Sequence, residues 1–158
     1  MKRCLTAYLL PVLGLLALSA SCRAVEIRAP EGFVVYTKLP GSEFRAISAE
    51  GIALRVKQTP NEPASDVALW SRSLKLNLES RGYVVRSEEP IQAGALKGSV
   101  LKTASRIANQ DFGYICALFV VDRDLYFVEA AGAYPEFGAR EAQILDAIRS
   151  FKPKPGLL

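Results

Sequence analysis

Histidine is missing from all 158 residues of the chain. This absence rules out a Ser-His-Asp triad, an imidazole general base and an imidazole metal ligand. Cysteine is scarce as well, with Cys4, Cys22 and Cys116 as its three occurrences. Three widely spaced thiols cannot form a clustered zinc site or a disulfide framework. We therefore expect no metal, no cofactor and no catalytic activity.

An excess of charge is also missing once the chain is divided at residue 22. The formal net charge is +4, of which Lys2 and Arg3 contribute two units to a segment that contains no acidic residue. The remaining residues are close to electrically balanced, and no basic stripe runs along them. Nucleic-acid binding requires such a stripe, so we expect no nucleic-acid partner. The length is that of one domain.

The N-terminal segment has the three-part layout of a secretory signal. Met1-Lys2-Arg3 is positively charged, and residues 5–18 are apolar apart from three positions. Small residues, Ser19-Ala20-Ser21, follow. A bilayer-spanning helix needs about 20 apolar residues, so this run is too short for a permanent anchor. We predict that residues 1–21 are a signal peptide.

The end of this segment, Leu18-Ser19-Ala20-Ser21-Cys22, resembles the bacterial lipobox. The resemblance implies that the Cys22 thiol is diacylated and that the leader is cleaved before it. Ser19 stands where the family prefers leucine. The expected partner is then membrane lipid through Cys22, and the absence of Asp at position 23 implies the outer membrane, facing the periplasm. The alternative is ordinary cleavage that releases a soluble periplasmic protein.

The first half of the mature chain is predicted to form strands and a helix. Residues 22–32 are predicted to be a lipidated tether. Strands are expected at 33–39, 44–48 and 52–59, and the last two form a hairpin. A helix capped by Ser65 or Asp66 is expected to reach Arg81, where Gly82 ends it. Its apolar stripe includes Trp70, which we interpret as a core residue.

The second half is predicted to be a meander followed by a helix. Strands are expected at 83–88, 96–106, 112–121 and 125–131, and Pro90 should bend or end the first of them. Residues 115–121 are apolar on both faces, which is typical of a central strand covered on both sides. The last helix is expected at 135–151, and residues 153–158 form a tail. The core stripe of this last helix is expected to contain Phe137, Ile144, Ile148 and Phe151.

This order of elements resembles the PsbP-like fold, known from an extrinsic subunit of plant photosystem II. The resemblance covers residues 33–152 as a single domain and implies an α+β fold, an α/β/α sandwich around an antiparallel sheet. It implies no chemistry, because such domains serve as assembly factors, binding proteins and accessory subunits. The residues that carry it are Phe44-Arg45-Ala46-Ile47, Gly51-Ile52, Ala68-Leu69-Trp70, Gly82-Tyr83 and Ile148-Arg149-Ser150-Phe151.

Glu129 is the main candidate for a catalytic group, because it interrupts an apolar strand. A carboxyl group in such surroundings would have a raised pKa and could act as a general acid or base. The alternative is that strand alternation turns Glu129 to solvent near the end of the strand. We favour the second interpretation.

Three further residues carry candidate chemistry. Cys116 could be a nucleophile, but no histidine exists to activate it, and its apolar neighbours favour a small buried side chain. Asp122 and Asp124 could bind a cation, but two carboxylates without further clustered ligands make a poor calcium site. Turn formation explains them better.

The expected function is that of a non-enzymatic binding or accessory module of the cell envelope, anchored through Cys22. An envelope protein is the expected partner. A soluble periplasmic protein that serves in immunity or secretion is the first alternative. An envelope enzyme that uses Glu129 is the second.

Overall fold

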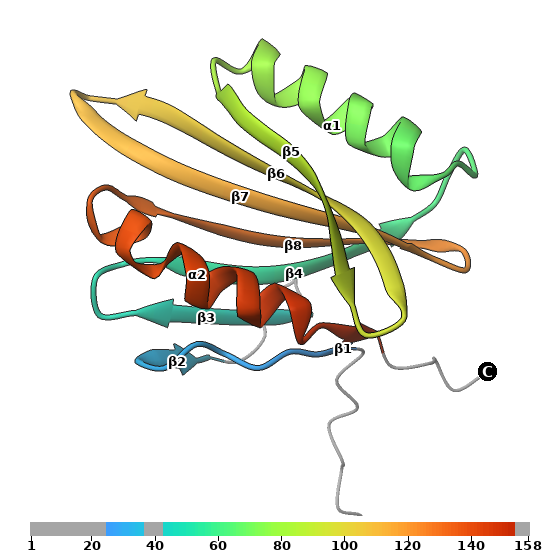
Figure 1. Cartoon of the computed structure of the whole chain (residues 1–158), viewed down its shortest axis with the longest axis horizontal. Helices are drawn as coiled ribbons and strands as arrows, with labels where there is room; N and C mark the ends of the chain where they lie inside the picture. Colours follow the sequence, from blue (N-terminus) through green and yellow to red (C-terminus); the bar gives the residue numbers. More distant parts are fainter. Residues whose placement is uncertain (1–24, 37–42, 154–158) are drawn as a thin grey trace, which may run out of the picture.

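A seven-stranded antiparallel sheet forms the centre of the protein (Figure 1). The computed structural model describes residues 25–36 and 43–153. The predicted signal peptide and Cys22 lie outside the described residues. The strands follow the order β2-β3-β4-β8-β7-β6-β5. Their bounds are Phe33–Val35 (β2), Phe44–Ser48 (β3), Ala53–Pro60 (β4), Val84–Ala93 (β5), Leu96–Ile107 (β6), Gln110–Val121 (β7) and Asp124–Ala133 (β8).

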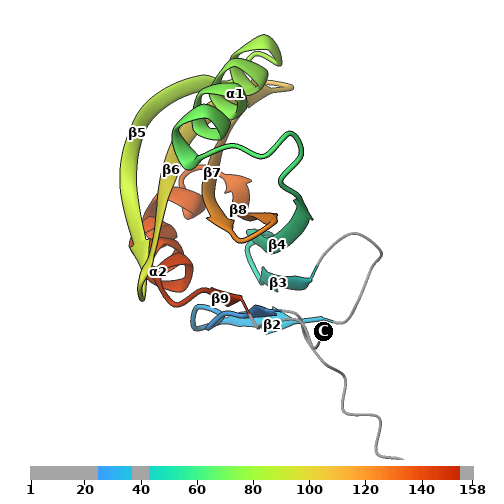
Figure 2. The ribbon, with the colours of Figure 1, turned by 90° about the vertical axis from the view of Figure 1, so that its right-hand side faces the viewer.

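Two helices lie on opposite faces of this sheet, which confirms the predicted sandwich and its α+β class (Figure 2). They are α1, Val67–Ser80, and α2, Glu136–Arg149. The predicted cap of α1 is confirmed, because the Asp66 side chain accepts a hydrogen bond from the Leu69 backbone at 2.9 Å. Gly82 follows the helix with a φ of 84°, a conformation that glycine adopts without steric cost.

The main hydrophobic core lies between the sheet and α2. The predicted stripe of α2 is confirmed, since all four of its residues are buried. The Phe119 and Phe151 rings lie 5.3 Å apart between centroids. Residues 115–119 of β7 are buried throughout, which confirms that this strand is central and covered on both faces. α2 thus supplies the larger apolar layer.

A pair of glycines provides the seat for the first aromatic residue of α2. Gly113 on β7 pairs with Gly132 on β8, and the ring of Phe137 lies directly over this pair. A Cβ atom at Gly113 would overlap the Phe137 ring, and one at Gly132 would approach Ile52 Cγ1 to 2.8 Å. The bare backbone therefore allows the helix to approach the sheet closely.

Pro90 does not end its strand, so the predicted end of this strand at residue 88 was wrong. β5 continues to Ala93, and Pro90 pairs with Ser99 of β6. The physical reason is the position of β5 at the edge of the sheet. A proline in an edge strand can direct its missing N–H away from the ladder without leaving a partner unpaired.

A second, two-stranded sheet joins the two ends of the described chain. β1, Val25–Glu26, pairs with β9, Lys152–Pro153. Val25 and Ile27 belong to the core, and the Arg28 backbone donates to Ser150 Oγ at 2.9 Å. From Val25 onward, the segment predicted as a tether is therefore packed against the domain.

Helix α1 buries fewer side chains than α2. Its buried residues are Ser71 and Leu78. Trp70 is only half-buried, in contrast to the predicted core position, and its indole Nε1 donates to Asn61 Oδ1 at 2.7 Å. Ser71 instead contacts the sheet, because its Oγ donates a hydrogen bond to Glu88 Oε1 at 2.7 Å. Within the described residues, neither helix is long and apolar enough to cross a membrane.

Candidate functional site

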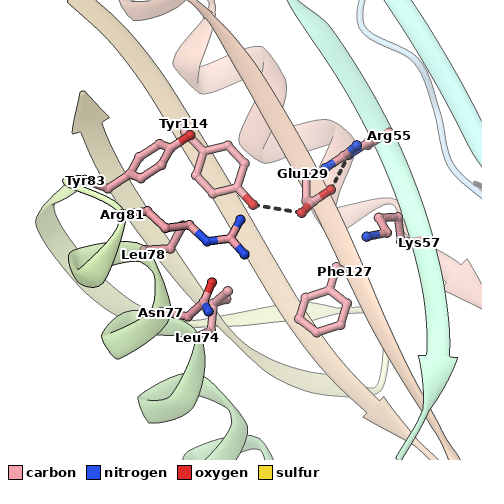
Figure 3. Close-up of a pocket in the computed structure, with 10 residues that line it drawn as sticks. All are labelled: Arg55, Lys57, Leu74, Asn77, Leu78, Arg81, Tyr83, Tyr114, Phe127 and Glu129. Atoms are coloured by element: carbon pink, nitrogen blue, oxygen red, sulfur yellow. Dashed lines mark hydrogen bonds and ion pairs between the residues drawn. The ribbon is translucent and has the colours of Figure 1, made fainter. Parts of the chain in front are cut away.

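Helix α1 packs along β5, β6 and β7, and leaves the same face of β8, β4 and β3 uncovered. Two adjoining pockets, with volumes of about 320 and 330 Å³, lie at this boundary. They share Arg55, Tyr83, Tyr114 and Glu129 (Figure 3). We call the two pockets together the α1 groove. Because its walls come from a helix end and four strands, its shape depends on the whole sandwich.

Glu129 lies in the floor of the α1 groove, which shows that the prediction of a solvent-facing side chain was wrong. Its side chain is only 11% exposed. The Tyr114 hydroxyl donates to Glu129 Oε1 at 2.8 Å, and Arg55 Nε donates to Glu129 Oε2. The strand alternation was predicted correctly, but Glu129 is in the middle of the face that α1 half covers. Its neighbours on β4 and β7 therefore close over it.

The two donors to Glu129 are held in their donating forms. Burial alone would lower the pKa of Arg55, but the hydrogen bond and the charge of Glu129 outweigh it, so the Arg55 pKa is raised. Burial, and then the neighbouring Cys116 and Glu129, raise the pKa of Tyr114 well above its ordinary value. Tyr114 thus stays protonated and Arg55 stays charged around neutral pH. Both oxygens of Glu129 accept bonds, which suits a structural carboxylate better than a general base.

The α1 groove carries more positive than negative charge. Arg45, Lys57 and Arg81 line it together with Arg55, while Glu129 is the one carboxylate among its described lining residues. Among the described residues, the first three have no acidic partner within ion-pair distance. Figure 3 shows Arg81 and Lys57 on opposite sides, with their charged ends directed into the space between them.

Aromatic and aliphatic side chains form the rest of the lining. The Tyr83 and Tyr114 rings lie 5.6 Å apart in a tilted arrangement. Phe127 and Leu74 border the side toward α1, and Ala53 borders the side toward β3. The α1 groove therefore combines positive charge with apolar contact surface, and can hold a molecule that has both an anionic and an apolar part.

Sequence reasoning found Glu129 but missed the cations around it. Arg55 and Lys57 stand on the polar face of a predicted alternating strand, where solvation is the ordinary expectation. Arg45 comes from β3, and Arg81 follows the last turn of α1. Strand pairing brings Arg45 beside Arg55 and Arg55 beside Glu129, whereas Arg81 joins them through the packing of α1 on the sheet. The two positive residues on the alternating strand were the one available indication.

The other candidate residues do not join this site. Cys116 is fully buried, and burial, followed by the charge of Glu129, raises its pKa to about 12. Asp122 is exposed in the turn between β7 and β8, with a φ of 53°, and Asp124 begins β8. In the part of the chain that the structure describes, no three His, Cys, Asp or Glu residues gather into a metal-binding group.

We expect Cys116 to be unreactive toward thiol reagents in the folded protein, because the thiolate is the reactive form and burial disfavours it. Labelling with an aromatic disulfide reagent near pH 8 should detect no Cys116 thiol until denaturant is added. A Cys116→Ala variant should lose the signal seen in denaturant. Rapid labelling of Cys116 in the native protein would contradict the expectation.

Comparisons with known proteins identify the fold. No protein-family model and no curated protein sequence matches the chain. Among solved structures, LpqN of Mycobacterium tuberculosis, described as involved in cell envelope biogenesis, is similar with a TM-score of 0.68 at 8% identity, over 83% of each chain. The cyanobacterial PsbP (CyanoP) of Synechocystis sp. PCC 6803 is similar with a TM-score of 0.60 at 11% identity, over 85% of this chain and 89% of CyanoP.

A third similar structure is PA94 of Pseudomonas aeruginosa, described as a protein of unknown function. It has a TM-score of 0.59 at 10% identity, over 82% of this chain and 87% of PA94. These likenesses confirm the PsbP-like fold predicted from the sequence. At such low identity they concern the fold alone.

Proposed function

We propose that this protein is a non-enzymatic binding module of the cell envelope, held at the membrane by acyl chains on Cys22. The observation that carries the binding role is the α1 groove, whose one carboxylate is engaged by Arg55 and Tyr114 while several cations remain unpaired among the described residues. This arrangement is suited to holding a ligand, since the described lining contains no activated nucleophile.

The envelope location is supported by the predicted leader and lipobox-like segment before Cys22. It is also supported by the fold that the chain shares with LpqN, a protein described as involved in cell envelope biogenesis. Two or three acyl chains anchor a protein stably, at about 0.8 kcal/mol for each buried CH₂ group. The outer membrane facing the periplasm is the proposed site, because Asp is absent after Cys22.

Intact-mass analysis of the membrane-extracted protein tests the anchor. We expect a product that begins at Cys22 and carries the added mass of two or three acyl chains. The Cys22→Ala variant should lose this mass and leave the membrane fraction, while Cys116→Ala, as the matched control, should keep both. An unmodified mature chain would reject the anchor and favour the soluble periplasmic alternative.

An envelope enzyme that uses Glu129 is the second candidate, because Glu129 lies in a pocket and not on a convex surface. A crosslinking pulldown from intact membranes and a turnover assay distinguish the two functions. A binding or accessory module should retain a reproducible envelope partner or ligand in both the wild type and Glu129→Gln. An enzyme should show substrate turnover that Glu129→Gln abolishes.

A further inference from the structure

Four positive side chains converge on the α1 groove at a cost to the sheet. Arg45 on β3 and Arg55 on β4 are direct cross-strand partners, and like charges in this position destabilise a sheet. Lys57 stands two residues further along the same face of β4. A concave site lined by charge of one sign concentrates the field and attracts ions of the opposite sign. The groove therefore favours an anion.

Arg45 supplies a second, independent observation. Its Nε is buried at the edge of the α1 groove and has no hydrogen-bond partner among the described residues. A buried donor that stays unpaired destabilises the protein, because it has lost its bonds to water. An anion near the same guanidinium would offset this cost through its charge, because the planar fork of arginine donors suits carboxylate and phosphate.

The size and the remaining lining restrict the ligand further. A volume of about 320 Å³ for the pocket beside α1 is near the lower limit of ligand-binding pockets, roughly 300–1,000 Å³. Tyr83, Tyr114 and Phe127 offer ring faces and edges to an apolar group. A single ring or a short aliphatic group fits such a space, whereas the long tails of a membrane lipid do not.

We propose that the α1 groove binds a small anionic amphiphile, a molecule that carries a phosphate or carboxylate head on one compact apolar body. In the pocket beside α1, Arg81 and Lys57 face the head from opposite sides, and Tyr83 and Phe127 contact the apolar body. Arg45 adds positive charge from the adjoining pocket. This inference rests on the proposed binding function and names the class of its ligand.

Equilibrium dialysis with phenyl phosphate tests the proposal, because this probe combines one anionic head with one ring. The probes that carry only half of these features are inorganic phosphate and phenol. We expect each to bind at least tenfold more weakly than phenyl phosphate, a difference of about 1.4 kcal/mol. The purified full-length product is used, in phosphatidylcholine nanodiscs if it is acylated and in buffer if it is not.

Variants that are expected to weaken or to tighten binding show where phenyl phosphate binds. The double variant Lys57→Gln and Arg81→Gln should weaken phenyl phosphate at least tenfold. The matched control, Lys97→Gln with Lys152→Gln, removes two exposed lysines outside the groove and should change nothing. Glu129→Gln should tighten binding several-fold, because it removes the one negative charge of the groove while Arg55 stays.

Two sources could supply such a head in an envelope, a free small molecule or a lipid head group at the membrane surface. Adding phosphatidylglycerol to the nanodiscs, or as vesicles to the unacylated protein, distinguishes them. A lower apparent affinity for phenyl phosphate would identify the lipid head group as a competitor. An unchanged affinity would identify a free ligand, and both results agree with the proposal.

The proposal is overturned if phenyl phosphate does not bind, if the groove double variant and its control behave alike, or if Glu129→Gln weakens binding. These outcomes are independent of the membrane anchor, which the intact mass of the protein decides. Loss of the anchor with retained phenyl phosphate binding would reject the location and keep the ligand class. A retained anchor without phenyl phosphate binding would keep the location and reject the ligand class.

Discussion

Replacing Gly113 with alanine is expected to lower the free energy of unfolding by about 3 kcal/mol, the upper end of the usual range for overpacked cores. The added Cβ would overlap the ring of Phe137, and Phe137 is only 1% exposed. Neither the ring nor the β7 backbone can move without disturbing the core between the sheet and α2. Denaturant unfolding, followed by circular dichroism, measures the loss.

The same substitution at Gly138 is the matched control. Gly138 is an exposed residue of α2, where alanine gains about 1 kcal/mol in helix propensity. Its added Cβ would lie 3.0 Å from Tyr134 Cε1, in the ring of a side chain that is only half-buried, so the net change should stay below about 1 kcal/mol. If Gly113→Ala proved as mild as Gly138→Ala, the glycine seat under Phe137 would be rejected.

The Arg55→Ala variant is expected to lose about 2 kcal/mol of stability, because it leaves the Glu129 carboxylate in the groove with Tyr114 as its one remaining partner. Removing one member of a fully buried pair costs about 3–5 kcal/mol. The Arg55 side chain is 43% exposed, and we reduce the expected loss accordingly. The double variant Arg55→Ala with Glu129→Gln should recover part of the loss, since no unpaired charge remains.

Arg106→Ala provides the comparison for this pair. Arg106 and Asp111 form an ion pair in which both side chains are largely exposed, 69% and 64%. Such pairs contribute little, and the expected change is below about 0.5 kcal/mol. Equal effects of Arg55→Ala and Arg106→Ala in urea unfolding would show that Glu129 is well solvated and does not depend on Arg55.

The layers of the fold could be predicted from the sequence because its apolar pattern is strong. The double-faced apolar run at 115–121 indicated a central strand, and Gly82 marked the end of a helix. Pro90 misled because proline ends a strand only where its N–H is needed, and the sequence does not reveal which strand lies at the edge. The glycine pair under Phe137 was equally hidden, since a glycine in a strand ordinarily reads as a weak point.

The candidate site was only partly predictable, for a related reason. Glu129 was noticed because it stands in an apolar strand, but its exposure depends on how far α1 extends across the sheet. Ser71 takes a buried position on α1 while Trp70 stays half-exposed. The side of α1 that faces the sheet is therefore not the side that the apolar stripe suggests. Which strands α1 leaves uncovered depends on this tertiary packing, and no local pattern encodes it.

The pairing of β1 with β9 sets the distance at which an acylated protein would work. Val25 is already buried in the core, so only residues 22–24 would separate the lipid from the domain. Three residues span at most about 10 Å when fully extended. A tether this short would keep the β1–β9 edge against the head groups. Helix α1, at the far end of the domain, would then face the aqueous space (Figure 2). The α1 groove would then stay within one domain length of the bilayer, while large partners would have to approach from the side of α1.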